Sequence, residues 1–192
     1  GIVNITNMEQ NVDFLTTYKK QVNDFHFSGS VGGNMRYYKG TSVNNSSKNG
    51  VGLITSGVYS LSNIAPASLN YSSYLSQKGV NSLYGLLNMS YRDMVFLDVT
   101  GRNDWSSTLP VNNRSYFYPS ASLSVLVDQI IPLPKQINMF KLRGGVARVG
   151  NDTSPYNLSN VLANPGSWGD VLRLTKSGTL LTPNLKPEQS TS

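Results

Sequence analysis

Few side chains in this sequence are suited to catalysis. The chain has no cysteine, which excludes disulfides, thiolate zinc ligands and cysteine nucleophiles within it. His26 is its single histidine, so a zinc site would have to be built from carboxylates. No serine lies in the strand–turn–helix setting of a hydrolase nucleophile. We therefore expect no enzyme, no catalytic residue, no bound metal and no cofactor.

The carboxylates are also poorly spaced for chemistry. Asp98 and Asp104 lie six residues apart, on what the sequence predicts to be a strand and the loop that follows it. The pairs Asn103-Asp104 and Asn151-Asp152 each offer only two oxygen-bearing side chains, whereas Ca²⁺ takes about six to eight oxygens. Hydrogen bonding within the loops is the simpler interpretation of these residues.

The composition suits a β-sheet that faces water on one side and an apolar environment on the other. Charged residues make up 14% of the chain, against about 25% in soluble domains, and Ser and Asn fill much of the difference. The net charge of +6 comes from scattered Lys and Arg residues without a basic block, so we expect no nucleic-acid partner. No apolar run is long enough for a transmembrane helix, and the first ten residues do not resemble a secretory signal.

Period-two alternation of apolar and polar residues recurs along the chain and predicts strands of about 8–13 residues. The clearest stretches are residues 25–38, 82–91, 94–102 and 119–127. Arg92-Asp93 is predicted to form a tight turn, whereas residues 103–115 and 151–169 read as long polar loops. The glycine-rich run GSVGG at 29–33 lacks the Lys-Ser/Thr of a phosphate loop, and within a strand it allows close packing or a bend.

Two architectures fit these strands. Short turns that alternate with long loops, on strands with one apolar face, are typical of a transmembrane β-barrel. Tyr37, Tyr91 and residues 116–118 then stand at strand ends, where barrels carry aromatic girdles. A soluble β-sandwich also alternates, but its core needs more Ile, Val and Leu and its surface more Lys and Glu. The composition therefore favours an all-β, antiparallel barrel segment.

Two stretches fit this pattern poorly. Within residues 1–21, the spacing of Met8, Val12 and Leu15 weakly predicts a helix. Residues 40–61 include GTSVNNSSKNG, which reads as a loop.

The motif TGRNDWSSTLPVNNRSYFYPSASLS, at residues 100–124, closely resembles a signature of the SusC/RagA family of TonB-linked outer-membrane transporters. SYRDMVFLDVTGRNDWSSTLP, FKLRGGVARVGNDTSPYNL and NLKPEQSTS follow one another in the order that this family shows, and HFSGSVGGNMR matches an upstream strand. The resemblance covers nearly the whole chain from about residue 25.

The resemblance implies a barrel of roughly 22 strands, of which residues 1–192 supply a part, without the N-terminal plug or a recognisable TonB box. It implies TonB-driven import of oligosaccharides, or in some members peptides, through the outer membrane of a Gram-negative bacterium of the Bacteroidota type. The implied partners are a SusD-like surface lipoprotein, TonB and outer-membrane lipid. The alternative is a soluble or surface β-sandwich module that binds glycans.

Within this resemblance, short turns face the periplasm and long loops face the outside, which selects the candidate binding residues. Trp105 has two interpretations: a stacking platform for sugar or for the lipoprotein, or a ring that folds back to fill its own loop. The loop 151–169 offers further aromatic contacts, and the wet face of the strand at 94–102 offers polar ones. The candidates are Asn103, Asp104, Trp105, Arg114, Tyr156, Trp168, Asp98 and Arg102.

Overall fold

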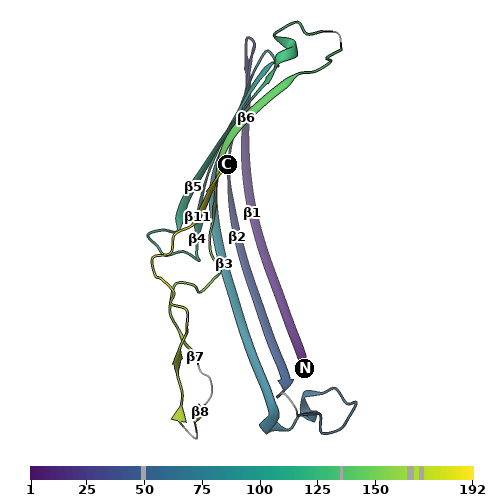
Figure 1. Cartoon of the computed structure of the whole chain (residues 1–192), viewed down its shortest axis with the longest axis vertical. Coiled ribbons are helices and arrows are strands. Elements are labelled where there is room, and N and C mark those ends of the chain that lie inside the picture. The colour runs from purple at the N-terminus through teal and green to yellow at the C-terminus, as the bar shows by residue number, and fades with distance from the viewer. Residues whose placement is uncertain (49–50, 135, 164–166, 169–170) are drawn as a thin grey trace. The chain divides into compact units, whose positions relative to one another are not determined.

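The computed structural model describes residues 1–192 except 49–50, 135, 164–166 and 169–170. For residues 167 and 168 it describes the backbone only. Its main element is a seven-stranded sheet of order β1-β2-β3-β4-β5-β6-β11, in which each strand up to β6 lies beside its predecessor in the chain (Figure 1). The neighbouring pairs from β3 to β11 are antiparallel. The strands are β1 (Ile2–Val22), β2 (Phe25–Ser47), β3 (Leu69–Tyr91), β4 (Val95–Ser106), β5 (Ser115–Leu126), β6 (Lys141–Asn151) and β11 (Glu188–Thr191).

The remaining elements are short. The strands β7 (Leu162–Ala163) and β10 (Thr175–Lys176) form one small ribbon, and β8 (Ser167–Trp168) and β9 (Val171–Leu172) form another. Three 3₁₀ turns complete the list: η1 (Leu61–Asn63), η2 (Pro66–Ser68) and η3 (Val127–Gln129). Among the described residues, no helix has the length and hydropathy needed to cross a membrane.

The chain divides into two compact units, and the first three strands contribute to both. The smaller unit comprises Gly1–Gln10 and Arg36–Lys78, and the larger comprises Asn11–Met35 and Gly79–Ser192. In the smaller unit, the Asn63 side chain bonds to the backbone of Thr55 and Val58 and thereby closes the loop that contains η1. The candidate residues all belong to the larger unit.

The predicted alternation is confirmed by the register of the larger unit. On one face, Asn88 lies opposite Asp98, which lies opposite Ser122. One residue along each strand, Leu87, Val99 and Ala121 form the matching row on the other face. We call these the polar face and the apolar face of the sheet.

The apolar face is uncovered in the larger unit. Leu87 and Leu123 lie in the middle of their strands, yet their side chains are 44% and 48% exposed. A sandwich would bury such residues under a second sheet. Their exposure therefore shows that no second sheet of the described chain covers this face.

The tight turn predicted at Arg92-Asp93 is present. Both residues have positive φ, 50° and 54°, and the Met94 N–H donates to the Tyr91 carbonyl oxygen at 3.0 Å. Two consecutive positive φ values define a type I′ turn, whose twist matches that of the strands it joins. Arg92 also donates to the Asp24 carboxylate at 2.8 Å, which raises the pKa of the Arg92 guanidinium and ties this turn to the one between β1 and β2.

Four expectations from the sequence are wrong. The strands were expected to have about 8–13 residues, but β1, β2 and β3 have 21, 23 and 23. The first residues are not helical, because Ile2–Val22 form β1 and pair with β2, and side-chain bonds such as Asn34 Nδ2 to Asp13 Oδ1 at 2.6 Å cross between these two strands. Residues 40–47 belong to β2 and not to a loop. The loop expected at 103–115 is shorter, because β4 continues to Ser106 and β5 begins at Ser115. In the last three cases a neighbouring strand provides the hydrogen-bond partners for the backbone, so these polar segments do not need a helix or a loop to satisfy their N–H and C=O groups.

The glycines of GSVGG allow close packing, as the sequence predicts. A Cβ on Gly32 would stand 2.6 Å from the Tyr84 ring, and a Cβ on Gly33 would stand 2.5 Å from the Phe14 ring. A Cβ on Gly29 would meet nothing within 4 Å. Two adjacent glycines therefore admit an aromatic ring on each face of the sheet.

Candidate functional site

The candidate site is the polar face of β4, where successive side chains on one side of the strand are Asp98, Thr100, Arg102 and Asp104. Alternation along a strand places every second residue on the same face. Strand pairing puts β3 and β5 on either side, so each of these side chains has a neighbour from both. The two carboxylates at the ends of this row have very different surroundings.

Asp104 is buried, and each of its carboxylate oxygens accepts a hydrogen bond. Its residue is 6% exposed, and Arg102 Nε donates to its Oδ1 at 2.8 Å. The Tyr118 hydroxyl donates to the other carboxylate oxygen, Oδ2. Arg102 also donates to Ser82 Oγ at 2.8 Å and lies over the Tyr84 ring at 5.7 Å. A buried charge needs such partners, because burial without them is costly.

A second set of bonds extends this arrangement to the loop after β4. The buried Ser106 hydroxyl donates to Asp152 Oδ2, and Thr108 Oγ1 donates to the same oxygen at 3.3 Å. Asp152 follows β6, so these bonds join two loops that are 44 residues or more apart in the chain. We call the combined set the Asp104 cluster: Ser82, Arg102, Asp104, Ser106, Thr108, Tyr118 and Asp152.

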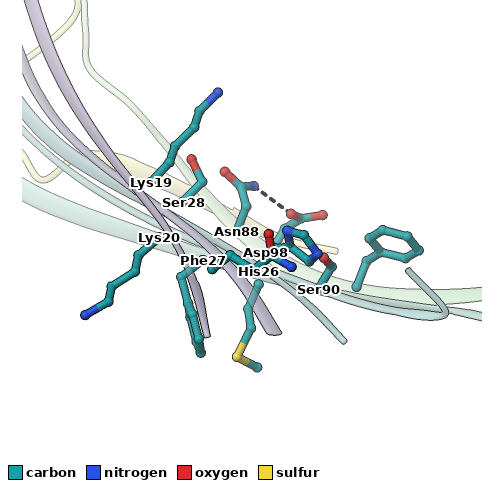
Figure 2. Close-up of a pocket in the computed structure, with 11 residues that line it drawn as sticks. Lys19, Lys20, His26, Phe27, Ser28, Asn88, Ser90 and Asp98 are labelled. Atoms are coloured by element: carbon teal, nitrogen blue, oxygen red, sulfur yellow. Dashed lines mark hydrogen bonds between the residues drawn. The ribbon is translucent and has the colours of Figure 1, made fainter. Parts of the chain in front are cut away.

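Asp98 lies in an open pocket of about 440 Å³ on the same face (Figure 2). Asn88 Nδ2 donates to its Oδ1 at 2.6 Å, and Ser122 Oγ donates to its Oδ2 at the longer distance of 3.4 Å. We call this the Asp98 pocket. Its lining comes from β1, β2, β3 and β4: Lys19, Lys20, Gln21, His26, Phe27, Ser28, Asn88, Met89, Ser90, Phe96 and Asp98.

A second pocket, of about 360 Å³, lies along the same row beside Arg102. It is lined by residues of β3, β4, β5 and β6, including Tyr84, Thr100 and Arg148. Thr100 and Ser120 share a hydrogen bond of 2.6 Å at its floor. The polar face therefore carries hollows on both sides of Thr100.

The residues predicted around Trp105 do not form one site. Trp105 was expected in a loop, but it is a strand residue that pairs with Asn81 and Ser115. Alternation places Trp105 and Asn103 on the apolar face, opposite to Asp104. Asn103 Nδ2 donates to Ser115 Oγ at 3.0 Å, and the Trp105 residue is 37% exposed.

The other candidates also stand apart. Arg114 is exposed, and its carbonyl oxygen accepts the Ser106 N–H at 3.0 Å. Tyr156 is exposed and has a φ of 67°, which is unusual for a tyrosine. The backbone of Trp168 belongs to β8, and its side chain lies outside the described residues.

The sequence analysis did not identify most residues around the two carboxylates. His26, Ser82 and Asn88 were assigned to alternating strands and Tyr118 to an aromatic girdle, whereas Tyr118 donates to Asp104 on the polar face. The sequence could have placed these four residues on the polar face, since all four have even numbers on strands whose even positions are polar. Their meeting depends on register, which places Ser82 opposite Asp104 and Asn88 opposite Asp98. Among the residues that the structure describes, no group of three His, Asp or Glu side chains is close enough to hold a metal ion.

Comparison with known proteins gives consistent matches. Residues 2–192 match the family model described as TonB dependent receptor-like, beta-barrel. TonB-dependent receptor P26 of Formosa agariphila is 26% identical over 180 residues, which cover 91% of this chain and 18% of the relative. TonB-dependent receptor P3 of the same organism is 30% identical over 88 residues, covering 44% of this chain and 9% of the relative.

Solved structures share the fold. The RagAB peptide transporter superposes with a TM-score of 0.85 at 20% identity, covering 98% of this chain and 21% of that chain. The RagAB peptide importer in the open-open state gives a TM-score of 0.81, also at 20% identity. The chain thus spans about a fifth of the length of the proteins it matches.

Proposed function

Because this chain belongs to the TonB-dependent receptor-like β-barrel family of the Gram-negative outer membrane, we propose that the complete protein imports large nutrients across that membrane. TonB supplies the energy, and a SusD-like surface lipoprotein is the partner that delivers cargo. The present chain contributes barrel strands and outward-facing loops. Its role is that of a conduit without chemistry of its own.

The single observation that carries this proposal is the contrast between the two faces of the sheet. Leucine and valine side chains are exposed along one face, while Asp, Asn, Ser and Thr occupy the other. Lipid on the first face and water in a lumen on the second stabilise this arrangement without any further protein layer.

The aromatic residues near the end of β4 support the same orientation. Trp105 and Phe117 lie on the apolar face, because Asn103 pairs with Phe117 and Trp105 with Ser115. Aromatic rings on the lipid side are typical of the membrane–water boundary. We infer that Trp105 anchors the barrel at the outer interface and that it does not bind cargo.

Oligosaccharide is the cargo class that the sequence resemblance favours, and peptide is its competitor. The solved neighbours are named as peptide transporters, but at 20% identity they share only the fold with this chain. Polar side chains in the hollows of the lumen face suit ligands rich in hydroxyl groups.

Uptake by living cells tests this function. A strain that lacks the gene for the complete protein should lose growth on its cargo and regain it from a plasmid copy. Deletion of the neighbouring lipoprotein gene or of TonB should abolish the regained growth. Growth that needs neither partner would contradict active import, and a complete protein that folds as a monomer in buffer without detergent would contradict the barrel.

A further inference from the structure

We propose that the apolar face binds a phospholipid at its short-turn end, with the phosphate at Lys20 and an acyl chain along the rings of Phe25, Phe27 and Tyr91. We call these four residues the Lys20 patch. The inference rests on the proposed function, because it names one lipid contact of a barrel in the outer membrane. It is carried by a lysine that extends to the apolar side of the sheet beside a cluster of aromatic rings.

Three aromatic rings gather at this end of the apolar face. The centroid of the Phe25 ring lies 4.7 Å from that of Tyr91 and 6.0 Å from that of Phe27. Tyr91 is on the apolar face because it lies four residues after Leu87 on the same strand. The Phe25 residue is 38% exposed, so the cluster presents an open apolar surface on which an acyl chain can lie.

Lys20 lies beside these rings and not on the polar face. The turn between β1 and β2 has two residues, which sets Lys20 opposite Phe27. The bond of 2.9 Å between Thr17 Oγ1 and Ser30 Oγ fits the same register. Figure 2 shows the side chains of Lys20 and Phe27 on one side of the strands and that of Lys19 on the other. The ammonium of Lys20 is therefore on the side of the sheet that meets lipid.

Lys20 and Arg92, both near the turns at this end, differ in their partners. Arg92 lies over the Tyr91 ring at 5.2 Å, but its guanidinium donates to the Asp24 carboxylate at 2.8 Å. Among the residues that the structure describes, Lys20 has neither a hydrogen bond nor an ion pair. A lysine on a lipid-facing surface is stable where its flexible stem brings the ammonium to the anionic phosphates of the headgroups. Charge complementarity therefore selects a phosphate as the partner of Lys20.

The spacing of two aromatic groups places the patch at a boundary of the membrane. Tyr91 pairs with Val95 at one end of β4, and Trp105 lies ten residues after Val95 on that strand. Ten residues span about 34 Å at roughly 3.4 Å each, and a strand tilt of about 35–45° reduces this to about 24–28 Å across the membrane. The apolar band of outer-membrane barrels is about 25 Å tall, so the patch lies at the boundary opposite to that of Trp105.

The turns identify the leaflet that provides the lipid. Two-residue turns at residues 23–24 and 92–93 lie at the patch end of the strands. Short turns mark the periplasmic end of outer-membrane barrels. The phosphate at Lys20 thus belongs to a phospholipid of the inner leaflet, and lipopolysaccharide of the outer leaflet is the competing source.

Acetylation of lysine amines tests this site in the purified complete protein in neutral detergent, because a bound phosphate shields the amine. The probe is phosphatidylglycerol, and a diacylglycerol with the same acyl chains is the control that lacks the phosphate. Peptide mass spectrometry measures each lysine separately. Phosphatidylglycerol should slow the acetylation of Lys20 by about fivefold, and the diacylglycerol should change it far less. Lys19, the adjacent residue on the other face, is the internal control and should react at the same rate with either lipid.

The same measurement tests the rings. Phe27→Ala removes the ring opposite Lys20 and should reduce the protection of Lys20 by phosphatidylglycerol about threefold. Phe117→Ala is the matched control, since Phe117 is an exposed phenylalanine on the same face near Trp105, and it should leave this protection unchanged. Equal effects of the two alanines would mean that the rings of the patch do not hold the lipid.

Other results would overturn the lipid site as a whole. They are equal slowing of Lys19 and Lys20, equal slowing by phosphatidylglycerol and the diacylglycerol, or stronger protection of Lys20 by lipopolysaccharide than by phosphatidylglycerol. None of these bears on import itself. Cells whose growth still needs the lipoprotein and TonB, with a purified protein that gives one of these results, would retain the proposed function and lose only the lipid site.

Discussion

The two carboxylates at the ends of one row on β4 illustrate how the same residue type serves different purposes. Asp104 is buried, and an arginine and a tyrosine each donate to one of its carboxylate oxygens. Asp98 lies in an open pocket, with an amide and a distant hydroxyl as its partners. The first arrangement holds loops and strands together, and the second leaves a carboxylate at an open pocket. Burial and the kind of partner, and not the number of hydrogen bonds, thus distinguish the two carboxylates along a single strand.

Both regions depend on the polar face being the wet one, and the largest expected effect tests this premise. Leu123→Arg places a charge at mid-strand on the apolar face, opposite Leu97, and should destabilise the complete barrel by about 2–4 kcal/mol. Ser122→Arg, one residue away on the polar face, should cost far less. Chemical unfolding in lipid vesicles measures both, and equal losses would mean that the faces are assigned the wrong way round.

The Asp104 cluster should respond strongly to loss of its carboxylate. Asp104→Ala leaves the Tyr118 hydroxyl and the half-buried Arg102 without their partner, and should cost about 2–3 kcal/mol of unfolding free energy. Protease sensitivity of the loop after β4 should rise as well, since Ser106 and Thr108 belong to the same cluster. A variant as stable as the parent would remove the structural role from Asp104.

Gly32, on β2, leaves room for the Tyr84 ring of β3, which lies beside the Asp104 cluster. Gly32→Ala brings a Cβ to 2.6 Å from the Tyr84 ring, and that ring lies under Arg102. We expect a loss of about 1–3 kcal/mol in unfolding free energy from this overpacking. Gly29→Ala, in the same motif, meets nothing within 4 Å and is the control. If the two alanines cost the same in thermal unfolding, close approach at Gly32 does not explain its presence.

The smallest effect on stability is expected at the Asp98 pocket. Asp98→Asn keeps the shape of the side chain and faces open solvent, so the unfolding free energy should change by less than about 1 kcal/mol. A cost comparable to that of Asp104→Ala in the same unfolding assay would abolish the distinction between the two regions.

Local patterns in the sequence predicted much of the fold. The alternation in residues 94–102 and 119–127 predicted both faces correctly, because side chains on a strand alternate whatever lies beside it. Arg92-Asp93 was predicted as a two-residue turn from the strands on either side of it. The motif at 100–124 identified the family, and the match over residues 2–192 confirms that membership.

Other features are decided only by the tertiary structure. The Trp105 segment is polar and reads as a loop, yet pairing with β3 and β5 makes it a strand and turns its ring to the apolar face. Asp152 meets Ser106 across 46 residues, and Lys19 meets the Asp98 pocket across three strand spacings. Such contacts depend on which strands pair and in what register, and no local period in the chain encodes that choice. The sequence alone therefore determined the two faces of the wall, while strand pairing decided which polar residues bond to one another and which remain available.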